Sequence, residues 1–389
     1  MKQPRWDPGL DVLALPVLQA GLGQCPQETA PLDDVDWSKL TSTVRRHRLQ
    51  GLLVSAVANR QIAATADQRA EIALRELDLT RDRFWHDVRL LQVTASLEDA
   101  GIEYRVLKGP AFGSLDYPDR IMRPTGDIDL LIRGNDLMAA VDTLRNEGAS
   151  LVDPDPVDGY SREIGKSKTV TMPDGLEVDL HRILVRGPFG VTMRTKDLWA
   201  TSRPFEIGGV PMATLGLEES LMHACYHLMI LSDKRALSIR DVAQFLVAPD
   251  LDPTRVVDLA DRWQASVVLG GAVLLVARMI PAFDEHPLVL WANSFRPGPI
   301  SRWNLRIAEP GNPIGPAEWP ATLLALDSNA HRLLLIKSII KPLPGTNDSF
   351  GNRLRRLLRR TLPKSPLFRL RRHRGDTVSS TSIRHNGAR

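Results

Sequence analysis

The chain has little cysteine, few aromatic residues and no long hydrophobic run. Its 389 residues include only Cys25 and Cys225, which form no disulfide or metal-binding pattern and favour a reducing compartment. The longest apolar stretch, residues 265–277, is 13 residues long, too short to cross a bilayer and typical of a core helix. Asp11 and Pro16 interrupt the apolar run near the N-terminus, so no signal peptide is predicted. We therefore expect a cytoplasmic protein.

Positive charge is concentrated at the C-terminal end. From Gly351 onward there are 11 arginines, one lysine and one aspartate, which leaves 38 basic and 45 acidic residues, a net charge of −7, in the rest of the chain. Within residues 353–374, leucines mark one face of a predicted basic helix: Leu354, Leu357, Leu358 and Leu362. Such a helix suits RNA, an anionic membrane surface or an acidic partner, and a solubilising extension is the alternative.

Hydrophobic periodicity divides the chain into four regions. Residues 1–100 and 201–345 are predicted to be helical, residues 101–200 to form an α/β core, and residues 346–389 to form a basic, partly disordered tail. The fold class is therefore α+β. One long helix is predicted over residues 68–100, ended by Gly101, with an apolar stripe at Leu77, Phe84, Val88, Leu91 and Ala95.

The α/β core has a recognisable order of elements. A strand over residues 102–107 is followed by a turn and a short helix over 108–117, and a second strand over 127–133 by a helix over 135–148. Residues 161–185 are predicted to form a β-hairpin that turns at residues 173–175. Together these elements make a small mixed sheet.

Two strands of this sheet carry acidic residues on one face. Asp127 and Asp129 are two positions apart, so in a strand their carboxylates project side by side. Like charges this close repel and need a counter-charge, for which a divalent cation is one candidate and solvent at a strand end the other. On the hairpin's second strand, Glu177, Asp179 and His181 also share a face. Three carboxylates can hold two Mg²⁺ ions.

The segments "VLKGPAF", "YPDRIMRPTGDIDLLI" and "LEVDLHR", with the later "IRDVAQFL", resemble the bacterial uncharacterised nucleotidyltransferase family of the DNA polymerase β-like superfamily. The resemblance covers about residues 37–341 and implies a nucleotidyltransferase-like mixed sheet flanked by N-terminal and C-terminal helical regions. It implies that the metal ligands and catalytic carboxylates are Asp127, Asp129 and Asp179. It also places Lys108 and Gly109 at a turn facing phosphate.

The activity implied is transfer of a nucleoside monophosphate from a nucleoside triphosphate such as ATP to a hydroxyl acceptor, with Mg²⁺ or Mn²⁺ as cofactor and release of pyrophosphate. Lys108 and Arg123 are expected to neutralise the pyrophosphate, and His181 is a candidate on the acceptor side. The turn reads Lys-Gly-Pro rather than the Gly-Ser usual in the superfamily, and Ser114 is a distant substitute for that serine. A toxin-like enzyme acting on tRNA and a non-catalytic nucleotide-binding or scaffold protein remain the alternatives.

Each candidate residue also has a structural alternative. The Asp127 and Asp129 pair can be a solvated strand end, and Lys108 a surface lysine. Asp179 can pair with Arg182 or His181, Arg123 can hold its loop by pairing with an aspartate, and His181 can make a structural hydrogen bond. Glu177 is expected at the rim of the site. His223 and His227, one helical turn apart, are expected to be a packed or surface pair rather than zinc ligands.

Overall fold

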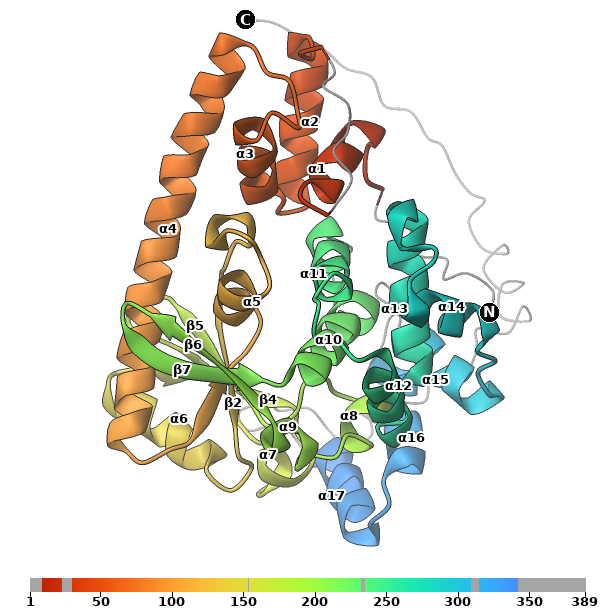
Figure 1. Ribbon diagram of the computed structural model, residues 1–389. Helices are drawn as coiled ribbons and strands as arrows, with labels where there is room; N and C mark the ends of the chain where they lie inside the picture. The colour runs from red at the N-terminus through yellow and green to blue at the C-terminus, as the bar shows by residue number, and fades with distance from the viewer. Residues whose placement is uncertain (1–8, 23–29, 153, 232–234, 309–314, 342–389) are drawn as a thin grey trace, which may run out of the picture.

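The computed structural model describes residues 9–22, 30–152, 154–231, 235–308 and 315–341 (Figure 1). The basic segment 353–374 lies outside the described residues, so its predicted helix and partner stay predictions. The fold is mixed α/β, with a five-stranded sheet flanked by helices on either side in the sequence. None of the described helices combines the length and apolar character that a membrane span requires.

The sheet has the strand order β1-β2-β5-β4-β3. β1 pairs antiparallel with β2, β2 pairs parallel with β5, and β4 pairs antiparallel with both β5 and β3. The bounds are β1 Tyr104–Val106, β2 Ile128–Ile132, β3 Ser150–Leu151, β4 Ser167–Thr171 and β5 Glu177–His181. Short helices and turns connect them: α5 Gly109–Leu115, η2 Arg120–Met122, α6 Leu137–Asn146 and α7 Tyr160–Glu163.

One face of the sheet is apolar apart from the buried Lys168 of β4, which is in register with Leu180 of β5. Ile128, Leu130 and Ile132 of β2 pack with Val178 and Leu180 of β5 in a single buried cluster. This cluster also contains side chains of α6 and of the C-terminal half of helix α4, Ala66–Asp99. A second β-hairpin, β6 Ser202–Ile207 and β7 Val210–Leu215, contributes to it as well. Residues with the alternate spacing therefore point to the other face, where the polar side chains of β2 and β5 lie.

The β6–β7 hairpin lies in a region that we expect to be helical. Its turn consists of Gly208 and Gly209, both with positive φ, which a two-residue hairpin turn of this kind requires. Phe205 and Ile207 alternate with exposed residues on β6, so the turn and the period were both present in the sequence.

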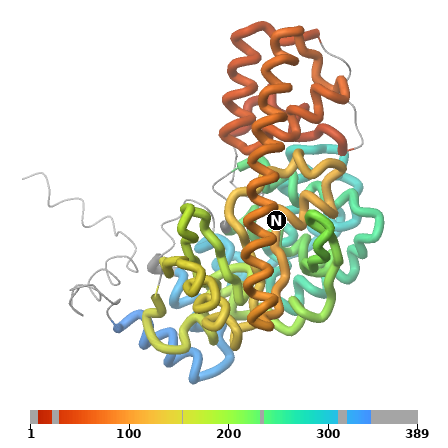
Figure 2. The backbone as a smooth tube through the Cα atoms, turned by 90° about the vertical axis from the view of Figure 1, so that its left-hand side faces the viewer, coloured from red at the N-terminus to blue at the C-terminus, as the bar shows by residue number. Residues whose placement is uncertain are grey.

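Helix α4, Ala66–Asp99, runs along one side of the molecule from the N-terminal helices to the sheet (Figures 1 and 2). It begins with a capping box of Thr65 and Gln68, and Gly101 follows its end with φ +70°. The helix and its end are as predicted, but the predicted apolar stripe is not the buried one. Leu77 and Phe84 are exposed, and the buried face is made of Ile72, His86, Leu90, Val93, Thr94 and Leu97.

The N-terminal helices lie at one end of α4 (Figure 2). They are η1 Val12–Ala14, α1 Leu15–Gln19, α2 Asp34–Arg46 and α3 Gln50–Ala58. α3 approaches the core closely, because a β-carbon at Gly51 would lie 1.9 Å from the carbonyl oxygen of Ile121 in η2. The N-terminal region is thereby fixed to the segment that leads into β2.

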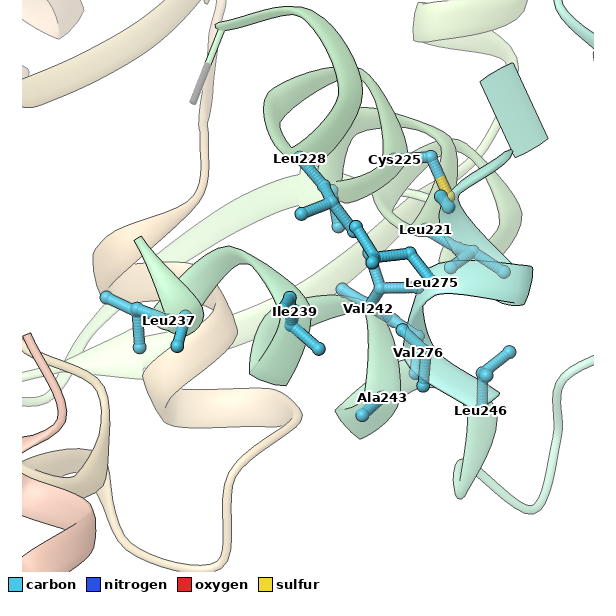
Figure 3. Close-up of a cluster of buried hydrophobic side chains, with 14 of the residues drawn as sticks. Leu221, Cys225, Leu228, Leu237, Ile239, Val242, Ala243, Leu246, Leu275 and Val276 are labelled. Atoms are coloured by element: carbon cyan, nitrogen blue, oxygen red, sulfur yellow. The ribbon is translucent and has the colours of Figure 1, made fainter. Parts of the chain in front are cut away.

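The helices after the sheet form a second apolar core, part of which Figure 3 shows. α10, α11 and α13 contribute Leu221, Cys225, Ile239, Val242, Ala243, Leu246, Leu275 and Val276 to it, with Leu228 from the π-helical turn after α10. α13 contains the apolar run of the sequence and is a core helix, as predicted. The elements of this region, in chain order, are α8 Pro188–Val191, α9 Asp197–Ala200, α10 Leu217–Tyr226, the π-helical turn His227–Leu231, α11 Ala236–Leu246, α12 Pro253–Arg262, α13 Ser266–Met279, η4 Pro281–Phe283, α14 Pro287–Ser294, α15 Pro299–Ala308, α16 Gly315–Ala325 and α17 Asn329–Ile340.

Candidate active site

The parallel pairing of β2 with β5 brings two predicted carboxylates together. Asp129 lies directly beside Asp179 in the strand register, although 50 positions separate them in the sequence. Both are on the face opposite the apolar cluster. Asp129 is 5% exposed, whereas Asp179 is half-buried and accepts a hydrogen bond from the Thr169 hydroxyl of β4.

Two side chains contact the carboxylate of Asp129, one from a lysine and one from a histidine. The Lys108 Nζ lies 3.1 Å from each of its carboxylate oxygens, and the His181 Nε2 lies 2.7 Å from Oδ1. Burial alone would raise the pKa of Asp129, but the Lys108 ammonium and His181 hold the pKa well below its usual range. The carboxylate is therefore ionised at any physiological pH and available to a cation.

Lys108 is not the free surface lysine of the structural alternative, since its ammonium is bound to Asp129 at a site that is largely buried. It occupies the turn between β1 and α5 with φ +48°, a conformation uncommon for residues other than glycine. Gly109 follows, and a β-carbon there would lie 2.9 Å from the Thr125 Cγ2. Glycine thus lets this turn approach the loop before β2.

His181 is fully buried and lies between a carbonyl and a carboxylate. Its Nδ1 is 3.3 Å from the carbonyl oxygen of Ile183, and its Nε2 faces Asp129. Burial, together with the nearby Lys166 ammonium, lowers the pKa of His181. Because Asp129 is ionised, Nε2 carries the proton here and donates to its Oδ1. A metal ion held by Asp129 would require the other tautomer, in which Nδ1–H donates to the Ile183 carbonyl and the Nε2 lone pair is free, as is common for metal-binding histidines.

Ligand atoms of Asp129, Asp179 and His181 all lie within 4.8 Å of one another. Two carboxylate oxygens and one imidazole nitrogen at this separation can share one divalent cation. The residues therefore fit the metal that the fold family implies. Oxygen ligands suit Mg²⁺ and Mn²⁺ alike, and an imidazole ligand is more usual for transition metals such as Mn²⁺ than for Mg²⁺.

Asp127 is placed differently from the other two aspartates. It precedes β2, is exposed, and stands outside the convergent group, although it lines a cleft that Asp129 also lines. Its backbone carbonyl is 3.2 Å from the Nε2 of His86 on α4, which fixes the loop before the strand. Its role as a metal ligand therefore stays a prediction.

This cleft has a volume of about 280 Å³ and lies between the sheet, the α2–α3 junction and the start of α11. Its lining combines four cationic side chains with three carboxylates and a histidine: Arg48, Lys108, Arg123, Arg235, Asp127, Asp129, Asp241 and His227. Such a set of charges, next to a candidate metal site, can bind a polyphosphate.

Arg123 pairs with an aspartate, which is the structural role considered above as the alternative to phosphate binding. Its Nε and Nη2 donate to the two carboxylate oxygens of Asp241 on α11 at 2.7 and 2.9 Å, and its Nη1 donates to the Pro124 carbonyl at 2.6 Å. The Tyr117 hydroxyl donates to the same carboxylate at 2.7 Å. Arg123 thus joins the loop before β2 to the C-terminal helices, and contact with phosphate stays a prediction.

The remaining candidates, apart from His227, lie away from the cleft lining. The Ser114 hydroxyl donates to the Pro110 carbonyl within α5 at 2.8 Å, so its role in phosphate binding stays a prediction. Glu177 is exposed at the start of β5, as expected of a rim residue. His223 is fully buried with no hydrogen-bond partner on either ring nitrogen, and the Nδ1 of His227 lies 3.0 Å from the Ser238 hydroxyl. Neither histidine belongs to a convergent metal-ligand group within the described part of the chain.

Several residues of the site escape prediction from the sequence. Arg48 and Arg235 have no local motif and reach the cleft only through tertiary packing. Asp241 stands within the quoted "IRDVAQFL", so a signal for it was present. Lys166, just before β4, is half-buried, and burial and the nearby Lys108 lower its pKa. A lysine at a strand start gives no sign of its position beside two carboxylates.

A candidate metal-ligand group beside a cationic cleft on a mixed sheet is the arrangement expected of a nucleotidyl-transferring protein. Comparison with protein families agrees: residues 33–281, more than half of the chain, match the family described as "Uncharacterised nucleotidyltransferase". The protein belongs to this family.

Other comparisons add little. No curated protein matches. Among solved structures, a match is found to an antigenic nucleotidyltransferase-like protein from Paracoccidioides brasiliensis, with 16% sequence identity, a TM-score of 0.33, and coverage of 52% of this chain and 92% of that one.

Proposed function

We propose that this protein transfers a nucleoside monophosphate from a nucleoside triphosphate to a hydroxyl acceptor and releases pyrophosphate. The observation that carries the proposal is the position of Asp129 beside Asp179 in adjacent parallel strands, with the His181 Nε2 converging on the same point. A bound divalent ion, Mg²⁺ or Mn²⁺, would supply charge neutralisation at the α-phosphate and at the attacking and leaving oxygens.

The residues of the chain have separate tasks in this proposal. Asp129 and Asp179 hold the metal from the sheet, Asp127 reaches it from the cleft, and His181 supplies a nitrogen ligand in place of the acceptor-side role expected from the sequence. The half-buried Asp179 is the carboxylate placed to accept the proton of the acceptor hydroxyl. These roles require the ionised Asp129 that the structure provides.

Lys108 has a second task. Its ammonium neutralises Asp129 at a distance of 3.1 Å. In the proposed reaction Lys108 would exchange this carboxylate for the phosphates, because its ammonium would compete with a divalent cation held by Asp129. The Lys108 ammonium would then neutralise the leaving pyrophosphate from within the same cleft.

The test is metal-dependent nucleotide binding. Calorimetric titration with each nucleoside triphosphate, with and without Mg²⁺ or Mn²⁺, is compared for the wild type and the variant Asp127→Asn/Asp129→Asn. We expect binding that requires the metal and is lost in the variant. Asp142→Asn, an exposed carboxylate on α6, is the matched control and should bind as the wild type does. Identical titrations of wild type and double variant would mean that the aspartates are structural.

Turnover is tested separately, because a protein that binds nucleotide without catalysis would pass the binding test. Pyrophosphate release is measured with labelled nucleotide against a panel of hydroxyl acceptors that includes tRNA. Release with tRNA alone would select the toxin-like alternative. Metal-dependent binding without release against any acceptor would select the non-catalytic one.

A further inference from the structure

Arg48 is a cationic residue of the cleft that comes from the N-terminal helices. It lies in the turn between α2 and α3 with φ +58°. Its Nη2 donates to the Thr125 carbonyl at 3.2 Å, and a β-carbon at Gly126 would lie 3.2 Å from the same nitrogen. Gly126 therefore leaves the space that the guanidinium occupies, immediately before Asp127.

The charge of Arg48 is not matched by an ion pair. No carboxylate lies within 4.0 Å of its guanidinium in the described ranges, and one N–H of the five is used, in the bond to Thr125. Burial lowers the pKa of Arg48, the nearby guanidinium groups of Arg123 and Arg235 lower it further, and the more distant carboxylates of Asp127 and Asp241 offset only part of this. A half-buried cation in this position is stabilised by an anion that contacts it directly.

Two other cations of the cleft differ from Arg48 in this respect. Arg123 is neutralised by Asp241, and Lys108 is bound to Asp129. Arg48 therefore has unused hydrogen-bond donors facing a cleft that already contains the metal-site carboxylate. A planar guanidinium matches the oxygens of a phosphate in a bidentate arrangement.

We propose that Arg48 binds the terminal phosphates of the nucleoside triphosphate, so that the N-terminal helices form part of the nucleotide site. The inference rests on the proposed function, which places the α-phosphate at the group of Asp129 and Asp179. Arg48 lines the same cleft as Asp127 and Asp129 and is held at its edge by the bond to the Thr125 carbonyl. With the α-phosphate at the carboxylates, we assign the β- and γ-phosphates to this cation. Several clustered cations also suit a ligand with several negative charges better than a single carboxylate.

The experiment compares three ligands on two matched variants. Arg48→Gln removes the charge and the planar set of guanidinium donors. Arg46→Gln removes an exposed arginine at the end of α2, which donates to the Gly9 carbonyl at 3.4 Å. Each protein is titrated by calorimetry, in the presence of Mn²⁺, with inorganic tripolyphosphate, with a nucleoside triphosphate and with the matching monophosphate.

We expect Arg48→Gln to weaken tripolyphosphate and triphosphate binding about 10- to 100-fold, the loss typical of a charged hydrogen-bonding group, and monophosphate binding less than about twofold. Arg46→Gln should match the wild type for all three ligands. Arg48→Lys keeps the charge without the planar guanidinium donors, so its affinity for tripolyphosphate should lie between those of the wild type and Arg48→Gln. Because Arg48→Lys keeps the positive charge and the length of the side chain, it also decides the question if Arg48→Gln fails to fold.

Two results would overturn the inference: equal losses for monophosphate and triphosphate, or no loss for either. Failure of this inference can be told apart from failure of the proposed function. If no acceptor yields pyrophosphate but the losses follow the expected order, the transferase proposal fails and the phosphate site stands.

Discussion

The buried pair of Arg123 and Asp241 should be among the most sensitive positions in the protein. The two side chains are 7% and 5% exposed, and Asp241 accepts three hydrogen bonds, two from Arg123 and one from Tyr117. Burial alone would lower the pKa of Arg123, but Asp241 raises it above its ordinary value, so Arg123 stays charged. Asp241→Asn removes the charge while keeping the size, and leaves a guanidinium buried without a counter-charge.

We expect Asp241→Asn to lower the free energy of unfolding by about 3–5 kcal/mol, the range for breaking a buried pair on one side. The measurement is urea unfolding followed by tryptophan fluorescence, with midpoints compared at equal slope. Glu103→Gln breaks the exposed pair with Arg133, whose side chains are 44% and 47% exposed, and should cost less than about 1 kcal/mol.

The double variant Arg123→Met/Asp241→Leu provides the decisive comparison. Replacing both charges with apolar side chains of similar volume should recover most of the lost stability, because neither variant side chain then carries an uncompensated charge. Two results would refute the reasoning: an Asp241→Asn midpoint no lower than that of Glu103→Gln, or a double variant as unstable as the single one. Either would mean that the ion pair does not join the loop before β2 to α11.

Three further predictions concern the metal, pH and packing. Lys108→Met removes a cation that competes for Asp129, so the affinity for Mn²⁺ without nucleotide should rise, measured by electron paramagnetic resonance, while turnover falls. Burial lowers the pKa of His227 to about 3, so the unfolded chain binds a proton that the folded protein excludes. The free energy of unfolding should therefore fall as pH drops below about 6.5, and His227→Gln should make the fall shallower in urea titrations at several pH values. Gly51→Ala places a β-carbon 1.9 Å from the Ile121 carbonyl oxygen and should lower the thermal midpoint by several degrees in calorimetry.

Local pattern was enough to predict the elements that carry the carboxylates. Alternation about Asp127 and Asp129 predicted β2, and the turn at residues 173–175 predicted the β4–β5 hairpin, because period and turn chemistry act over a few residues. What pattern does not contain is which strand lies beside which. The parallel register of β2 and β5, and with it the contact of Asp129 with His181, is set by packing between distant segments.

Burial was harder to predict than secondary structure. α4 carries apolar residues on more than one face, so its period is compatible with two stripes, and Leu77 and Phe84 belong to the exposed one. Likewise nothing near Arg48 or Arg235 indicates a shared cleft, because their positions depend on how the helices close over the sheet. The carboxylates of the sheet were therefore predictable, whereas two of the four cleft cations, Arg48 and Arg235, were not.

The cleft is built from three stretches of sequence, and this limits how the protein can be divided. Arg48 precedes the sheet, Asp127 and Asp129 belong to it, and Asp241 follows it. A fragment of residues 101–200 would retain the aspartates but leave Arg123 without the carboxylate that neutralises it. Recombination between relatives at either edge of the sheet would likewise combine cleft residues of one protein with cleft residues of another, whose charges need not match. The unit that is inherited and exchanged intact should thus be the whole span from the α2–α3 junction to α11.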